Sequence, residues 1–313
     1  MQLIRYPQYK PLNLSSNMVV GSCVTVGNFD GVHLGHQALI TQVVNEARRA
    51  GKLSVVVCMQ PMPLQYFKGS GAVEILTPFK QKFRLFESLG VDIMCLLNFN
   101  QQLAAMSAAD FYRHIICTGL NAESVLVGDD FRFGVNREGD FRVLQALAQD
   151  DGVNVMQLET VVGHSQRVSS TAIRNNLRAG DFALAKAMLG REFSVEGRVA
   201  HGKKIGRTIG YPTINLELKH GAFPLHGIYI VEITIKGVQY QAVASVGYNP
   251  TIGGNAKRLE VYVLGFDQQI YGQCVEVLFY KKLRNEVEFD SLNALTSAIE
   301  EDVRLTQTFF AKQ

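Results

Sequence analysis

The first half of the chain alternates short, continuous apolar runs with segments whose apolar residues recur at helical spacing. Continuous apolar runs are typical of parallel strands buried on both faces. The intervening helices are indicated by a stripe from Leu39 to Ala47, a start at Thr77-Pro78 and a capping pattern at Ser107. The alternation predicts right-handed βαβ crossovers and an α/β Rossmann-like sheet. Its expected strands are Cys23–Val26, Leu53–Met59, Ile93–Leu97, Ser124–Val127 and Val153–Met156.

The pattern changes near Leu189-Gly190, after which apolar and polar residues alternate with period two. Short, closely spaced segments of this kind are typical of antiparallel strands in a small barrel. A tight turn is expected at Lys236-Gly237 and a terminal helix at about Ser291–Leu305. We therefore predict a Rossmann-like domain over residues 1–186 and a six-stranded antiparallel barrel with a C-terminal helix over residues 187–313. Alternation indicates barrel strands at Phe193–Val199, Leu259–Val263 and Val275–Phe279, and a β-branched run before the turn and the segment after it indicate Ile228–Ile235 and Tyr240–Val246.

Composition indicates the number of domains, the compartment and the kinds of partner to expect. The length of 313 residues fits two domains of ordinary size, and the formal net charge of +3 is spread along the chain, so no nucleic-acid partner is indicated. The five cysteines are scattered without a C-x-x-C pair, which favours a reducing compartment. Because the sequence shows no signal peptide and no membrane-spanning run, we expect a cytoplasmic protein with no membrane partner. Protein partners cannot be read from the sequence.

A run rich in glycine and histidine, Gly27-Asn28-Phe29-Asp30-Gly31-Val32-His33-Leu34-Gly35-His36, follows the first expected strand and opens the first helix. Ligands bind at this position in open parallel sheets, and glycine lets the backbone approach a phosphate closely. The helix amino terminus beyond His36 should offer free N–H groups, and both histidines could donate hydrogen bonds to phosphate oxygens. The two histidines could instead ligate zinc or be ordinary loop residues, although no nearby Cys or His completes a tetrahedral set.

Two further polar loops follow the ends of expected strands. The segment Ser169-Ser170-Thr171 with Arg174 starts a helix and offers hydroxyls, N–H groups and a guanidinium to an anion, although a plain helix cap fits this pattern taken alone. The segment Gly128–Gly134 contains aromatic residues that could hold a planar ring or simply pack. Three such loops at one sheet edge together predict a ligand site there.

These three segments carry a resemblance. The strings GNFDGVHLGH, GDDFRFG and RVSSTAIR resemble the FMN adenylyltransferase module of bacterial bifunctional riboflavin kinase/FAD synthetase, in the nucleotidyltransferase superfamily. The resemblance implies that the FMN phosphate attacks the α-phosphorus of ATP and that pyrophosphate leaves. One departure is Gln60, where the family usually carries a glutamate. By the same resemblance Asp130 and Phe131 lie near the flavin, and ATP is held by Gly27, Phe29, His33, Gly35, His36, Ser170, Thr171 and Arg174.

The second half lacks a Walker P-loop, but it contains a run of spaced glycines and cations at Gly202–Gly210. This run, with Gly202, Gly206 and Arg207, could cradle phosphates or form a basic surface hairpin. Thr213 and Asn215 project to one side of the following extended segment. Their oxygens suit Mg²⁺, although two outward polar residues on an edge strand give the same pattern.

The string GRTIGYPTIN resembles the riboflavin kinase signature, and the resemblance assigns Glu260 as the general base that accepts the proton of the ribityl hydroxyl. Pattern alone does not choose Glu260 over Glu276. A second departure is Asn249, where the family usually has an arginine. The expected protein converts riboflavin to FMN and FMN to FAD, with ATP as co-substrate and Mg²⁺ as cofactor. A version with one decayed site and a non-catalytic flavin-binding regulator are the alternatives.

Overall fold

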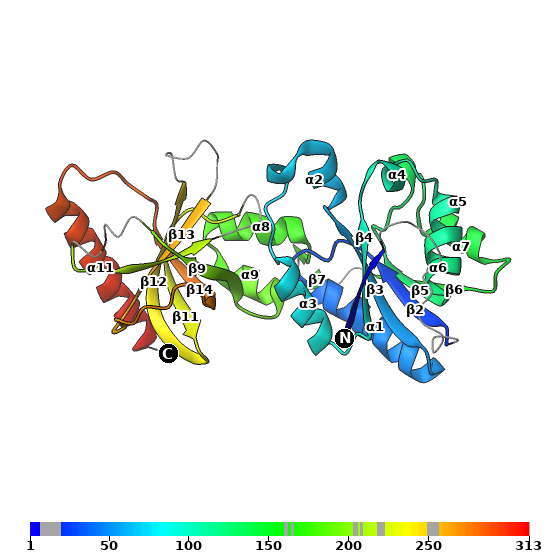
Figure 1. Ribbon diagram of the computed structural model, residues 1–313, viewed down its shortest axis with the longest axis horizontal. Coiled ribbons are helices and arrows are strands. Elements are labelled where there is room, and N and C mark those ends of the chain that lie inside the picture. The colour runs from blue at the N-terminus through cyan, green and yellow to red at the C-terminus, as the bar shows by residue number, and fades with distance from the viewer. Residues whose placement is uncertain are drawn as a thin grey trace. The chain divides into compact units, whose positions relative to one another are not determined.

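The computed structural model describes residues 1–6, 20–159, 162–163, 166–202, 206, 209–217, 223–248 and 257–312 (Figure 1). They form two compact units by their internal contacts. One unit is Met1–Val73 with Phe79–Ser169, and the other is Glu74–Pro78 with Ser170–Gln313. Among the described helices, none combines the length and apolar character needed to cross a membrane.

The first unit is built on a parallel sheet of six strands in the order β1-β4-β3-β2-β5-β6. The five predicted strands are confirmed, and one strand was missed. The missed strand, β1 (Gln2–Tyr6), is short, partly exposed and at the sheet edge, so it lacks the continuous apolar run of a buried strand. The other strands are β2 (Ser22–Val26), β3 (Leu53–Gln60), β4 (Ile93–Asn98), β5 (Ala122–Gly128) and β6 (Asn154–Leu158).

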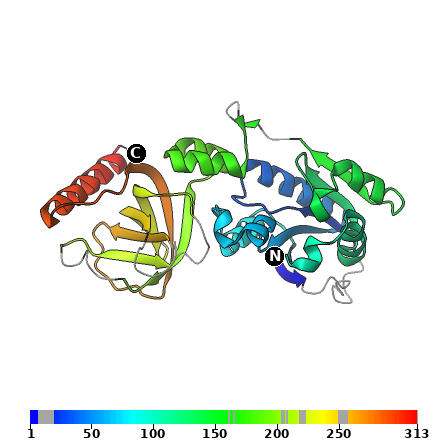
Figure 2. The same ribbon diagram turned by 90° about the horizontal axis from the view of Figure 1, so that it is seen from above.

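Helices cover both faces of this sheet, as Figures 1 and 2 show. Alternate strand residues point to opposite faces and enter two separate core clusters, with Val24 and Val55 in one and Cys23 and Val56 in the other. The predicted stripe from Leu39 to Ala47 is the buried face of α1 (Leu34–Ala50). The remaining helices of this unit are α2 (Pro63–Lys68), α3 (Phe79–Ser88), α4 (Gln101–Ala104), α5 (Ala108–Asp110), α6 (Thr118–Leu120) and α7 (Phe141–Ala148).

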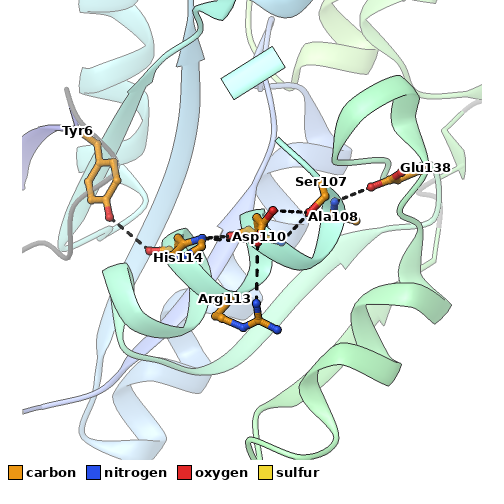
Figure 3. Close-up of polar contacts among 7 residues, drawn as sticks. All are labelled: Tyr6, Ser107, Ala108, Asp110, Arg113, His114 and Glu138. Atoms are coloured by element: carbon orange, nitrogen blue, oxygen red, sulfur yellow. Dashed lines mark hydrogen bonds and ion pairs between the residues drawn. The ribbon is translucent and has the colours of Figure 1, made fainter. Parts of the chain in front are cut away.

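The predicted capping start at Ser107 is confirmed (Figure 3). The Ser107 hydroxyl accepts a hydrogen bond from the Asp110 N–H at 3.0 Å, and the Glu138 carboxylate accepts one from the Ala108 N–H at 2.7 Å. The helix then continues as a π-helix over Phe111–Cys117, which the sequence pattern did not indicate. Glu138 thereby fastens the loop that follows β5 to the start of α5. A small hairpin of β7 (Val162–Gly163) and β8 (Gln166–Arg167) completes the unit.

The second unit contains the predicted closed barrel, with strand order β10-β13-β12-β11-β14-β9 and antiparallel pairing throughout. The predicted turn is confirmed, with left-handed backbone at Lys236 (φ 50°) and Gly237 (φ 83°). The terminal helix α11 (Leu292–Phe310) is capped by Ser291. The other elements are α8 (Ser170–Ala179), α9 (Phe182–Leu189), β9 (Phe193–Ala200), β10 (Thr213–Glu217), β11 (Gly227–Ile235), β12 (Val238–Tyr248), β13 (Lys257–Val263) and β14 (Cys274–Arg284).

Candidate active sites

The loop between β2 and α1 has an unusual backbone. Phe29 (φ 48°) and Val32 (φ 41°) both adopt the left-handed conformation, which is costly for a bulky or β-branched residue and is found most often at functional sites. The Phe29 side chain is only 3% exposed and packs edge-on against Phe86 and His36. Because this ring belongs to the core, Phe29 can meet a ligand only through its backbone.

Helix α1 begins earlier than the sequence suggested. It starts at Leu34, with His33 as its N-cap, so the N–H of His36 is not a free donor. The His33 Nδ1 accepts a hydrogen bond from that N–H at 3.3 Å, and the two imidazole rings stack with 3.6 Å between their centroids. A nitrogen that accepts a hydrogen bond carries no proton, so His33 is neutral and its Nε2 is the donor in this arrangement.

His36 is the more deeply desolvated of the two histidines. Burial, reinforced by the positive charge of Lys82, holds the pKa of His36 well below its usual value. Its Nδ1 is buried and has no hydrogen-bond partner within the described part of the chain. A neutral imidazole with an unsatisfied nitrogen next to a strained, glycine-rich loop is suited to hydrogen bonding with a ligand.

Lys82 was missed by the sequence reasoning. It lies on α3 three residues after Phe79 and four before Phe86, on the face that packs toward the sheet, and its Nζ donates to the carbonyl oxygen of Asn28 at 2.6 Å. The signal was present, because a lysine at helical spacing between two phenylalanines on the sheet-facing side must bury its stem and usually has a specific partner.

The loop after β5 is joined to the segment before α8. The Arg167 guanidinium lies 3.0 Å from the Asp129 carboxylate and 3.5 Å from that of Asp130, so two of the three motif segments meet in the first unit. Phe131 is half-buried and stacks on Phe133 with 5.2 Å between centroids. Phe131 therefore has a packing role, and only part of its ring is available to a ligand.

Ser170 and Thr171 form the first turn of α8, as expected. The Nε of Arg174, further along this helix, donates to the Glu74 carbonyl oxygen at 2.7 Å. Because α8 and Glu74 both belong to the second unit, Ser170, Thr171 and Arg174 form a group of their own. Gly35 belongs to the first unit, where it lies in the first turn of α1.

An aromatic cluster at the carboxyl ends of β3 and β4 was also missed. Tyr66, Phe67 and Phe99 stand edge to face, with 5.2 to 5.8 Å between ring centroids. Phe67 is 65% exposed, which is a large apolar surface for a single side chain. Two adjacent aromatic residues shortly after a Pro-x-Pro segment at a strand end were the available signal.

In the barrel, the structure brings the predicted residues together. Asn215 on β10 is the register partner of Glu260 on β13, and the Thr213 hydroxyl lies 3.5 Å from the Glu260 carboxylate. Arg258 donates from Nε to the Asn215 Oδ1 at 2.8 Å and forms an ion pair with Glu260. A Cβ atom on Gly202 would lie 2.2 Å from the Asn215 amide nitrogen, so only glycine fits beside Asn215 without a shift.

The donor chemistry of this barrel cluster fits Mg²⁺. A hydroxyl, an amide oxygen and a carboxylate are hard ligands, and the Asn215 oxygen already faces a cationic group, the Arg258 guanidinium.

Within the described ranges, no group of three or more His, Cys, Asp or Glu side chains is placed to hold a metal ion, which gives no support to a zinc site at His33 and His36.

Comparison with known proteins decides the family. A family model described as FAD synthetase matches residues 16–172, and one described as riboflavin kinase matches residues 189–310. A bifunctional riboflavin kinase/FMN adenylyltransferase of Pseudomonas fluorescens is 42% identical over 292 residues, covering 93% of this chain and 94% of the relative. One from Escherichia coli (strain K12) is 38% identical over 299 residues, covering 95% and 96%. This chain belongs to the bifunctional riboflavin kinase/FMN adenylyltransferase family.

A solved structure shares the whole fold. A Streptococcus pneumoniae protein named a macrolide-efflux protein is 31% identical and superposes with a TM-score of 0.84, covering 97% of this chain and 99% of its own. That name stands apart from the names of the curated relatives and of both family models. The family assignment rests on the latter, which agree with one another.

The structure describes only part of the glycine-rich segment before β10. Gly206 is described, and its carbonyl oxygen accepts a hydrogen bond from the Tyr211 N–H at 2.8 Å. Arg207, Lys203, Lys204 and Asn249 lie outside the described residues. Glu276, the alternative to Glu260, accepts a hydrogen bond from Ser194 at 2.7 Å on β9, so it has a structural partner of its own.

Proposed function

We propose that this chain phosphorylates riboflavin to FMN in the barrel and adenylylates FMN to FAD at the parallel sheet, consuming ATP at both steps. The observation that carries the proposal is the close grouping of Thr213, Asn215 and Glu260, because neither flavin binding nor packing requires such a set. We assign the adenylyltransferase to residues 1–186 and the kinase to residues 187–313, in agreement with the order of the two family matches.

In the kinase, Glu260 would accept the proton of the riboflavin 5′-hydroxyl as that oxygen attacks the γ-phosphorus of ATP, whose bond to the β–γ bridging oxygen breaks so that ADP leaves. Thr213 and Asn215 would hold Mg²⁺, which offsets negative charge on the phosphates when it is bound. Gly202 and Gly206 allow the backbone to approach the phosphates closely, and Arg207 would add a cation. Arg258 orients Asn215 and Glu260 toward each other through the contacts described above.

In the adenylyltransferase no protein nucleophile is needed, because the FMN phosphate itself attacks the α-phosphorus and pyrophosphate leaves. His33 and His36 would donate hydrogen bonds to phosphate oxygens, and the backbone of Gly27, Phe29 and Gly35 would line the same pocket. We assign Ser170, Thr171 and Arg174 to ATP as well, on the strength of their motif.

The flavin of the adenylyltransferase would lie near Asp130 and Phe131. The exposed face of Phe67 offers a second surface on which the planar ring system could stack, at the strand ends where ligands bind in such sheets.

The proposed setting is the cytoplasm, with small-molecule substrates and without a nucleic-acid or membrane partner. The cysteines support a reducing compartment, since all five are free and Cys23, Cys58 and Cys95 are buried.

The proposal is tested by incubating the purified protein with riboflavin, ATP and MgCl₂ and separating the flavins by chromatography. We expect FMN to form first and FAD to follow. FMN without FAD would indicate a decayed adenylyltransferase, for which Gln60 is the candidate lesion. Tight flavin binding without either product would establish the regulator instead.

A further inference from the structure

Lys82 is a buried cation with an incomplete set of partners. The residue is 9% exposed, and its one polar contact in the described part of the chain is the hydrogen bond to the Asn28 carbonyl oxygen at 2.6 Å. No carboxylate among the described residues pairs with its ammonium group. Because an ammonium group carries three N–H donors, two remain for another acceptor.

A buried ammonium without a counter-ion is unfavourable. Removing such a charge from water costs several kcal/mol, and one carbonyl dipole offsets only part of that cost. The charge of Lys82 acts on its surroundings, since it lowers the pKa of His36 and opposes the effect of burial on the Cys58 thiol. The buried charge of Lys82 is therefore most favourable when an anion binds at the loop that contains Asn28 and acts as its counter-ion.

The loop itself has no positive charge with which to balance a bound anion. From Gly27 to Gln37 the sequence contains no lysine or arginine, and its one carboxylate, Asp30, is negative. His33 is neutral because its Nδ1 accepts a hydrogen bond, and His36 is neutral because its pKa lies well below its usual value. Two neutral imidazoles can donate hydrogen bonds to a polyphosphate, but they do not balance its charge.

We propose that Lys82 binds the triphosphate of ATP in the adenylyltransferase and, after the reaction, the departing pyrophosphate. The Asn28 carbonyl holds the ammonium group beneath the loop, and its two remaining N–H donors face the incoming phosphate oxygens. This inference rests on the proposed function of the loop as an ATP site. The competing explanation is purely structural, with Lys82 serving only to pin the Asn28 carbonyl.

The test compares charge with hydrogen bonding at one position in the full-length protein. Lys82→Met removes both, Lys82→Gln retains a neutral donor, and Lys82→Arg retains the charge. Lys80→Gln, two residues earlier on the same helix and exposed, is the matched control. FAD formation from supplied FMN gives the KM for ATP, the KM for FMN and the inhibition constant of pyrophosphate against ATP. The thermal midpoint of each preparation reports whether the first unit is folded, and riboflavin phosphorylation reports the amount of active barrel.

In the Met and Gln variants, we expect the KM for ATP and the pyrophosphate inhibition constant to rise about tenfold or more, which corresponds to about 1.4 kcal/mol of lost binding. The KM for FMN should stay within about threefold of wild type. Lys82→Arg should recover most of the loss, and Lys80→Gln should behave as wild type.

A pyrophosphate inhibition constant that is unchanged in Lys82→Gln would overturn the inference, as would an Arg variant as impaired as the Gln variant. Pinning alone predicts that the thermal midpoint and the KM for FMN change together with the KM for ATP. If the neutral variants do not fold, the wild-type lysine Nζ resonances decide the matter by NMR. The wild-type Lys82 signal is identified as the one that is missing from the spectrum of Lys82→Arg. This signal must shift when pyrophosphate is added to the wild type, and the absence of a shift rejects the contact. Failure of the wild type to make FAD would instead reject the proposed function.

Discussion

At the scale of single residues, the two candidate sites use different chemistry. The barrel site has a carboxylate, Glu260, next to the oxygens of Thr213 and Asn215, which suits proton transfer combined with metal binding. The site after β2 has neutral imidazoles and a buried ammonium, which suit a reaction in which the substrate phosphate is the nucleophile. The two activities should therefore respond to different substitutions.

Replacing the proposed base, Glu260, tests the kinase site. Glu260→Gln should lower FMN formation from riboflavin by about two to four orders of magnitude, the usual contribution of a general base, and leave FAD formation from supplied FMN unchanged. Glu276→Gln is the matched control, because Glu276 contacts Ser194 and should not affect either rate. Equal losses in the two variants would remove Glu260 from its assigned role.

The buried imidazole of His36 predicts a pH dependence of stability. Since its pKa in the folded protein lies well below the unfolded value, the unfolded chain binds a proton near pH 6.5 that the folded chain does not accept. The stabilising contribution is present above pH 6.5 and is lost as the pH falls below it, by up to about 1.4 kcal/mol per pH unit.

This dependence is measured as the thermal midpoint of the intact protein between about pH 7.5 and 5.5, a range that brackets a histidine titration. His36→Gln should flatten the decline, whereas the same change at the exposed His114 should not. Parallel pH profiles in wild type and His36→Gln would contradict the assignment of a neutral His36.

At the scale of elements, the buried strands were predictable and the irregular segments were not. Strands β2 to β5 are largely buried apolar runs, because both faces of the sheet are covered there, whereas β6 was recognised although it is partly exposed at the other edge. β1 lies at an edge and mixes polar with apolar residues, and no local pattern indicates the π-helix at Phe111–Cys117. The start of α1 was misplaced because His33 caps the helix with its side chain, and histidine is not among the usual capping residues.

The loop after β5 is held by close packing at Gly134. This residue has φ 75°, and a Cβ atom there would lie 2.7 Å from the Ala108 nitrogen. Gly134→Ala should destabilise the protein by about 1–3 kcal/mol for the backbone conformation, because φ 75° with ψ 172° is accessible almost only to glycine, and by about 1–3 kcal/mol more for the clash. The loss should be accompanied by a higher KM for FMN, because the same loop carries Asp130 and Phe131.

A matched control for this substitution is Gly152→Ala, where φ is 67° and no atom lies within 4 Å of the added Cβ. It should cost only the backbone contribution, and urea unfolding of the two variants measures the difference. A Gly134→Ala variant as stable as Gly152→Ala would show that the loop is free to move away from α5.

At the scale of the whole molecule, the chain is a fusion of two enzymes with an obligatory order, since FMN made by one is the substrate of the other. The sequence predicted both folds, and it named Thr213, Asn215 and Glu260, which the pairing of β10 with β13 brings together. It did not predict Lys82 or Phe67, which come to their sites from neighbouring helices through packing.

If the two sites act independently, catalysis can be restored by mixing variants. Glu260→Gln alone should make no FAD from riboflavin, and His36→Ala alone should accumulate FMN. Mixed together with riboflavin and ATP, they should make FAD, because FMN diffuses from one protein to the other. Absence of FAD from the mixture, despite activity of each half with its own substrate, would mean that FMN passes between sites only within one chain.

The register between β10 and β13 has a consequence for how such enzymes can diverge. Asn215 and Glu260 face each other as partners in a ladder whose strands are also bonded to β9 and β12. Adding or deleting one residue within either strand would turn one of the pair to the opposite face of the barrel wall. Working relatives can therefore vary in length only between the strands, and gaps within these two strands should identify members that have lost the kinase.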